Sequence, residues 1–157
     1  MKKGKMIQGQ KNIIDRKSIS ELVKRGVSLR FYVASKTKHA PMWRELRALG
    51  IPIISTWIDE AGEGQTRDYS ELAVRCVREI SEADAILLYC EPGEILKGAQ
   101  AEYGIGLPLG KEIRCVGDSE TICRVFRKHP LWTDFPSLEA AIAAFKSTKN
   151  HVFSEAK

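Results

Sequence analysis

The sequence predicts an α/β fold, a three-layer sandwich of the flavodoxin-like or Rossmann-like kind with a small, mostly parallel sheet. Two observations support this. Short apolar segments rich in β-branched residues alternate along the chain with segments of helical periodicity, and Gly or Pro residues separate them. Such alternation is typical of βαβ units, whose right-handed crossovers place helices on both faces of a parallel sheet. The 157 residues suffice for one domain with a single core.

Four segments have the composition of strands, namely 27–35, 51–57, 85–89 and 113–116. A sheet of four strands is small, so we expect a homo-oligomer. The helical signals lie between and around these strands. They predict helices over 18–25, with a Ser18–Glu21 capping box, 41–49, with Pro41 in the first turn, 69–83, a short stretch around Glu102, 119–128, and 136–145, capped by Ser137.

Basic residues concentrate at the N-terminus. Residues 1–30 hold nine Lys and Arg against two acidic residues, whereas the rest of the chain has 16 basic and 18 acidic residues. We therefore divide the chain into a basic N-terminal arm with a short helix (1–26), an α/β domain (27–148) and a C-terminal tail (149–157). A basic arm is either a solvated tail or a binding segment for an acidic partner, so nucleic acid is expected only through residues 1–26.

Several classes of protein are disfavoured. No apolar run approaches the roughly 20 residues that span a bilayer, and no apolar segment follows the N-terminal lysines as in a secretory signal. We therefore expect a cytoplasmic protein with no membrane partner. The four cysteines form no CxxC pair and are expected to be buried free thiols. The three histidines are scattered, so we expect no metal.

The glycines Gly104, Gly106 and Gly110 do not form a dinucleotide fingerprint. The third glycine comes one position late, and the run ends a predicted helix instead of opening one. A P-loop, a GxSxG elbow and an HExxH motif are also missing from the sequence. We therefore expect no cofactor.

Carboxylates and aromatic residues follow the predicted strands. Glu91, Glu94 and Glu102 come after one strand, and Glu102 lies in a helix among small residues. Asp59 follows another strand and Tyr32 lies in the first. The carboxyl ends of parallel strands meet at one edge, where open α/β sheets bind ligands. Paired carboxylates beside a sugar are typical of glycosyl chemistry. The alternative is that the loop residues Glu91 and Glu94 are solvated charges.

Residues 31–117 resemble the nucleoside 2-deoxyribosyltransferase family. FYVAS at 31–35 is similar to the opening strand of that family. LLYCEPGEILKGAQAEYGIGLPLGKEI at 87–113 resembles its signature, an apolar strand that ends in an acid, then a loop, a Gly and a Glu that opens a helix. The resemblance implies N-glycosyl transfer or hydrolysis on (deoxy)nucleosides or their 5′-monophosphates. Glu102 would be the nucleophile at C1′, and Tyr32 would hold it through its phenol.

The implied reaction assigns further roles. Glu91 or Asp59 would protonate the leaving base, Trp57 would stack on it, and Gly98 would let the backbone approach the substrate. A 5′-phosphate would be held by cations after the first strand. The expected catalytic residues are Glu102, Tyr32 and Glu91. The expected substrate-binding residues are Ser35, Lys36, Trp57, Asp59 and Gly98, with Lys38 and Arg44 as further phosphate ligands.

Three positions depart from the resembled family. Its usual Asp six residues before the nucleophile is Leu96, its usual Thr or Ser before the Glu is Ala99, and an Asp on the preceding helix is Cys76. The departures leave a second hypothesis open, a non-catalytic nucleotide-binding module of the same fold. The sequence leaves the base preference and the choice between transfer and hydrolysis open.

Overall fold

The computed structural model describes residues 14–62 and 65–146, and its centre is one parallel sheet. The strands are β1 (Phe31–Ala34), β2 (Ala85–Tyr89), β3 (Glu112–Val116) and β4 (Trp132–Phe135), adjacent in that order and all parallel. The first three are buried along their whole length, as expected for strands covered on both faces. The predicted α/β class is confirmed.

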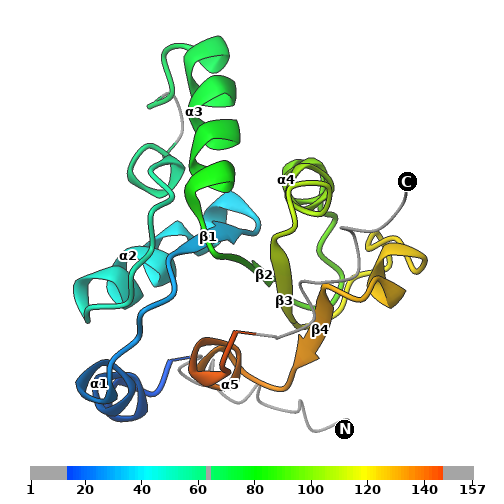
Figure 1. The fold of residues 1–157 in the computed structure, drawn as a ribbon. Helices are drawn as coiled ribbons and strands as arrows, with labels where there is room; N and C mark the ends of the chain where they lie inside the picture. The colour runs from blue at the N-terminus through cyan, green and yellow to red at the C-terminus, as the bar shows by residue number, and fades with distance from the viewer. Residues whose placement is uncertain (1–13, 63–64, 147–157) are drawn as a thin grey trace, which may run out of the picture.

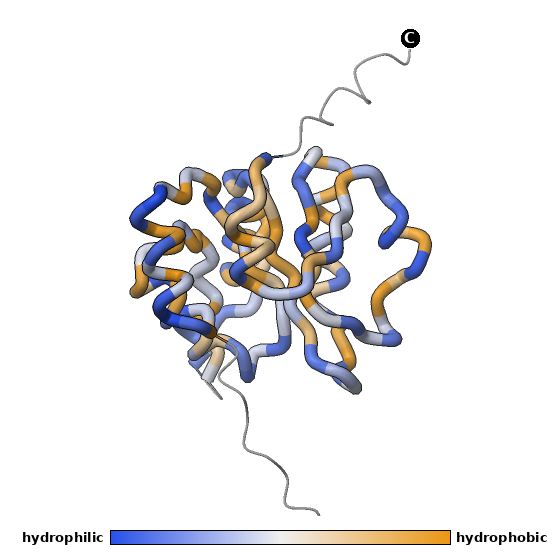
Figure 2. The backbone as a smooth tube through the Cα atoms, turned by 90° about the horizontal axis from the view of Figure 1, so that it is seen from below, coloured by the Kyte–Doolittle hydropathy of each residue, from blue (hydrophilic) through white to orange (hydrophobic). Residues whose placement is uncertain are grey.

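Helices cover both faces of the sheet. Figure 1 shows α3 (Tyr69–Glu82) and α4 (Gly98–Gly106) on one side and α1 (Arg16–Arg25) and α5 (Leu138–Ala143) on the other. The hydrophobic stretches of the chain run through the strands in the middle of the molecule (Figure 2). The helix α2 (Ala40–Ala48) follows β1 and buries Trp43 and Leu46. None of the helices within 14–62 and 65–146 has the length and apolar character needed to cross a membrane.

The predicted strand 51–57 is wrong as a strand. Only Ile53 pairs with β1, through one isolated parallel bridge to Phe31. Pro52 has no N–H to donate to a neighbouring strand. Beyond the Ile53 bridge, hydrogen bonds from side chains take the place of backbone hydrogen bonds between strands. The backbone N–H of Val33 donates to Ser55 Oγ (2.7 Å), and Trp57 Nε1 donates to the Val33 carbonyl (2.9 Å). The chain then turns into a 3₁₀ helix, Trp57–Asp59.

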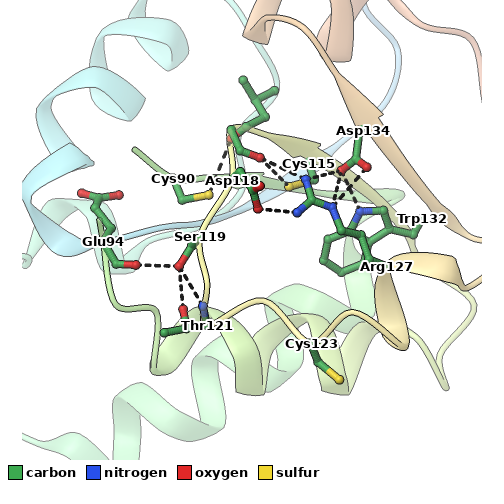
Figure 3. A network of polar contacts seen from close by, with 12 residues as sticks. Cys90, Glu94, Cys115, Asp118, Ser119, Thr121, Cys123, Arg127, Trp132 and Asp134 are labelled. Carbon is green, nitrogen blue, oxygen red and sulfur yellow. Dashed lines mark hydrogen bonds and ion pairs between the residues drawn. The ribbon is translucent and has the colours of Figure 1, made fainter. Parts of the chain in front are cut away.

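The predicted helix 119–128 is also wrong. This segment consists of bends and turns, and only its end, Phe126–Lys128, is a 3₁₀ helix. Hydrogen bonds from side chains hold it instead, because Arg127 pairs with both Asp118 and Asp134 (Figure 3). The strand β4 was not predicted, since it is short, lies at the edge and leaves Thr133 and Asp134 exposed.

The ends of the helices follow ordinary capping chemistry, with one correction. Helix α1 is capped by Asp15, which accepts from the Lys17 N–H (3.1 Å), and not by Ser18, which donates to Asp15 (2.6 Å). Ser137 caps α5 as predicted. Pro41 lies in the first turn of α2 as predicted.

The helical part of the predicted arm packs on the domain. Ile19 of α1 is fully buried, and α1 contacts α5. Residues 1–13 of the arm and the tail 149–157 lie outside the described residues. All four cysteines are free thiols. Cys90 and Cys115 are buried as predicted, Cys76 is half-buried, and the prediction is wrong for Cys123, which is exposed.

Candidate active site

A cavity of about 290 Å³ opens between α3 and α4. It lies at the carboxyl end of β1, which is where a parallel sheet offers loop and helix-end groups to a ligand. Its described lining residues are Ser35, Lys36, Thr37, Trp57, Leu72, Cys76, Ile95, Leu96, Lys97, Gly98, Ala99 and Glu102. The small residues of α4 (GAQAEYGIG) let this short helix lie close to the sheet.

The chemistry of the cavity centres on Glu102 and Tyr32. Tyr32 lies in β1, is fully buried, and donates its hydroxyl hydrogen to Glu102 Oε1 over 2.6 Å. Burial disfavours the charged carboxylate and raises the pKa of Glu102 to about 7, although the Tyr32 hydrogen bond acts in the opposite direction. Near neutral pH the carboxyl group therefore changes between its protonated and ionised forms.

The Cys76 thiol of α3 is the third member of this cluster. It lines the cavity together with Glu102. Burial and the neighbouring Glu102 raise the pKa of Tyr32 far above its ordinary value, so the phenol keeps its proton and acts as a donor. Burial also raises the pKa of the Cys76 thiol. One strand and two helices thus bring a thiol, a phenol and a carboxyl group together.

Four of the five predicted substrate-binding residues line the cavity, namely Ser35, Lys36, Trp57 and Gly98. The Trp57 ring is fixed by its hydrogen bond to the Val33 carbonyl. Ser35 Oγ accepts a hydrogen bond from Trp43 Nε1 (2.8 Å), which orients the hydroxyl. Gly98 opens α4, and the space where a Cβ would stand is free of other atoms within 4 Å.

Asp59 and Glu91 lie outside the described lining of the cavity, in contrast to the expectation that one of them faces the leaving base. Arg47 holds Asp59 through two hydrogen bonds and lowers the pKa of that carboxyl, the opposite of what a general acid requires. Glu91 pairs with Lys38 (3.0 Å). Both acids are therefore engaged by cations elsewhere on the surface.

The predicted phosphate ligands also divide into residues that line the cavity and residues that are bonded elsewhere. Lys38 pairs with Glu91 and Glu94, and Arg44 donates to the Ile58 carbonyl. Lys36 lines the cavity, and Lys97 joins it from the start of α4. Sequence reasoning missed Lys97, although its place directly before the small residues of α4 was a usable signal.

The three departures from the resembled family all lie in this cavity. Cys76, Leu96 and Ala99 line it together with Leu72 and Ile95. The wall is therefore built mainly from methyl, methylene and thiol groups at the positions where the resembled family has acids and a hydroxyl. No carboxyl group besides Glu102 is among the described lining residues.

A second loop holds this wall in place. Figure 3 shows Ser119, whose Oγ donates to the Glu94 carbonyl (2.6 Å) and contacts Thr121 Oγ1 (2.7 Å). Thr121 Oγ1 in turn accepts from the Leu96 N–H (3.0 Å). Sequence reasoning missed Ser119 and Thr121 because it placed them in a helix. They fix the segment that carries Leu96 and Lys97 into the cavity.

One cluster outside the cavity has the donor types of a metal site. His39, Glu91 and Glu94 each offer a ligand atom, all within 4.8 Å of one another. The Lys38 ammonium already lies between the two carboxylates, 3.0 Å from Glu91 Oε2 and 2.8 Å from Glu94 Oε1. His39 Nε2 lies 2.8 Å from the same Glu94 oxygen. Both carboxylates of the cluster are therefore already paired with side chains of the protein, and the cluster is an ion-pair network.

The fold and the cavity define an α/β protein with a part-buried carboxyl group, Glu102, in a cavity at the carboxyl end of β1. No model of a known protein family matches the chain, and no curated protein is similar to it in sequence. A solved structure with a similar course of the chain is the CMP N-glycosidase BcmB from Clostridium botulinum. The TM-score is 0.47 at 14% identity, over 72% of this chain and 93% of that chain.

Proposed function

We propose that this protein is an enzyme that cleaves or transfers the N-glycosidic bond of (deoxy)nucleosides or their 5′-monophosphates, with Glu102 as the nucleophile. The observation that supports it best is the 2.6 Å hydrogen bond from the buried Tyr32 hydroxyl to Oε1 of Glu102, which lines the cavity. The resemblance of residues 31–117 to the nucleoside 2-deoxyribosyltransferase family implies this pair. A ligand cavity at the carboxyl end of β1 fits the same role.

In the proposed reaction the ionised Glu102 attacks C1′ with Oε2, because Oε1 accepts the Tyr32 hydrogen bond. The bond between C1′ and the base nitrogen breaks, and its electron pair leaves with the base. Water or a second base then attacks C1′ of the glycosyl-enzyme and releases the carboxylate, with net retention of configuration. Tyr32 positions the carboxylate and takes no proton from it.

The departing base needs a proton. Because the described lining offers no second carboxyl group, the proton comes from water. The Trp57 ring supplies a flat apolar surface for the base.

The two lysines favour a phosphorylated substrate. Lys36 and Lys97 are exposed at the cavity with Ser35 and Thr37 close by in the sequence, a set of groups that suits a phosphate. A 5′-monophosphate held there would place its sugar toward Glu102. With such a substrate we propose hydrolysis as the main reaction, and with nucleosides transfer to an acceptor base.

The second candidate is a nucleotide-binding module without catalysis. The apolar side chains of Leu96 and Ala99 and the thiol of Cys76 favour it, because they offer no strong acceptor for sugar hydroxyls. The hydrogen-bonded Glu102 favours the enzyme, since carboxyl groups whose pKa is raised by burial occur preferentially at functional sites.

Product analysis by chromatography separates these candidates. The protein is incubated with each deoxynucleoside and each deoxynucleoside 5′-monophosphate, with and without a free acceptor base. Glu102→Gln is the matched control, because it keeps the shape of the side chain and removes the nucleophile. Release or exchange of base that disappears in the control supports the enzyme. No product from any substrate, with ligand-induced thermal stabilisation, supports the binding module.

A further inference from the structure

Two separate loops supply the lysines of the cavity. The loop after β1 brings Lys36 to the lining, and the loop after β2 brings Leu96 and Lys97. The second loop, 91–97, consists of turns and irregular backbone, so the hydrogen bonds of a helix or a sheet do not fix it against the first loop. The place of Lys97 relative to Lys36 therefore depends on side-chain contacts between the two loops.

The carboxylate of Glu94 makes those contacts. Its Oε1 atom forms an ion pair with Lys38 Nζ (2.8 Å) and a hydrogen bond with His39 Nε2 (2.8 Å). Both partners belong to the 3₁₀ helix Thr37–His39 of the first loop. Its Oε2 atom accepts from the backbone N–H of Glu91 (2.8 Å) in the second loop. Both oxygens are therefore used, and one side chain joins the two loops.

The Glu94 side chain makes these bonds away from water. It is 7% exposed, as is the side chain of His39. Burial opposes the ionisation of this carboxyl group, but the Lys38 ammonium and the Glu91 N–H hold the pKa of Glu94 below its ordinary value. The group is therefore a carboxylate at neutral pH. Hydrogen bonds to a charged group are strong where water is excluded, so they fix the geometry of the loops well.

Short connections lead from this carboxylate to both lysines of the cavity. The His39 N–H donates to the Lys36 carbonyl (3.0 Å), so these two residues share one tight turn. Lys97 follows Glu94 by three residues. Figure 3 shows that Ser119 holds the main chain of Glu94, because its Oγ donates to the Glu94 carbonyl (2.6 Å). The backbone of Glu94 is thus anchored, and its side chain determines where the first loop lies against it.

We propose that Glu94 is a positioning residue for phosphate recognition, which holds the loops after β1 and β2 together so that Lys36 and Lys97 bind one phosphate group. The inference rests on the phosphate site proposed above and adds a residue that does not itself touch the substrate. The ion pair with Lys38 also offsets a third positive charge on these loops. Lys36 and Lys97 are then the lysines of the described lining that a phosphate meets.

The first part of the test needs no substrate. Glu94→Ala removes both acceptor oxygens, so in the full chain the amide hydrogens of Glu91 and His39 are expected to exchange at least about tenfold faster by NMR. The amides of β2 are expected to keep their wild-type rates. Unchanged exchange at both positions overturns the proposal. Equal acceleration in β2 also overturns it, because the carboxylate would then stabilise the whole fold and not the loops.

The second part measures recognition of the phosphate. In a Glu102→Gln background, which prevents turnover, calorimetry compares a deoxynucleoside 5′-monophosphate with its nucleoside. Adding Glu94→Ala, or Glu94→Gln, which keeps the volume, is expected to weaken binding of the monophosphate about tenfold and to change that of the nucleoside less than about twofold. In the active protein the same single changes are expected to raise KM for the monophosphate and to leave kcat nearly unchanged. Equal effects on both ligands, or no effect on either, overturn the proposal.

Glu45→Ala is the matched control. It removes a carboxylate from the ion pair with Arg16, away from the described lining of the cavity, and is expected to leave exchange and both affinities unchanged. A wild type that binds the monophosphate but releases no base refutes the proposed reaction and leaves the role of Glu94 standing. A wild type that releases base from nucleosides and binds the monophosphate no more tightly refutes the role of Glu94 alone.

Discussion

Replacing Tyr32 by Phe removes the one hydroxyl that bonds Glu102 Oε1 and leaves the ring in place. A hydrogen bond to a charged group contributes roughly 1.5–3 kcal/mol. One pKa unit corresponds to about 1.4 kcal/mol, so losing this bond to the ionised form raises the pKa of Glu102 by about 1–2 units. The starting value is about 7, set by burial of the carboxyl group. The nucleophile of Tyr32→Phe therefore ionises at distinctly higher pH.

The assay is the pH profile of kcat/KM for base release. Because only the ionised carboxylate attacks, the activity of the wild type rises with pH through about 7. In Tyr32→Phe the rising limb moves up by about 1–2 units, so activity at pH 7 falls roughly 5- to 50-fold and recovers partly in alkali. An unmoved limb would refute the reasoning, even with lower activity, because it would show that the phenol does not act through the ionisation of Glu102.

Three further predictions follow from the same geometry. Burial raises the pKa of Glu102 from 4.5 to about 7, so the folded state loses stability as pH rises between these values. Glu102→Gln is therefore expected to have a free energy of unfolding roughly 2–4 kcal/mol higher than that of the wild type at pH 8, measured by urea denaturation. At pH 4 the two proteins are expected to be equally stable. Lys36→Ala and Lys97→Ala are expected to raise KM for a 5′-monophosphate about tenfold and to leave the nucleoside unaffected, and equal effects on both substrates would contradict a phosphate site. Removal of residues 1–13 is expected to abolish any binding to a DNA duplex and to leave nucleotide binding unchanged, in a gel-shift assay beside calorimetry. The deletion stops at 13 because Ile19 of α1 is part of the core.

The sequence carried enough information to predict the class of the fold and the central pair of the site. Strands β1, β2 and β3 are short apolar runs bounded by turns, and such runs predict buried parallel strands. Tyr32 and Glu102 are 70 residues apart, and the resemblance to a known family joined them before the structure did. Without it, both were single polar residues near strand ends, and no periodicity showed that they touch.

The failures have one physical cause, which is that tertiary hydrogen bonds overrode local propensity. Asp59 follows an apolar run as a site residue would, but Arg47 on α2 lies within reach and captures it. Residues 119–128 have a helical composition, and the side chains of Ser119 and Arg127 instead bond to other loops and strands. In the segment 51–57, which was predicted as a strand, the side chains of Ser55 and Trp57 form hydrogen bonds with the backbone of Val33 in place of strand pairing. Partners of this kind are far away in the sequence and leave no local pattern.

The most direct test of the central claim is to look for the glycosyl-enzyme itself. The protein is incubated with a 2-deoxy-2-fluoro nucleoside and its 5′-monophosphate, whose fluorine slows the second step, and is quenched and measured by intact mass spectrometry with peptide mapping. We predict a mass increase equal to one fluorosugar or fluorosugar phosphate, carried by Glu102 and missing from Glu102→Gln. An adduct on any other residue, or release of the base with no adduct at any time, would contradict the account.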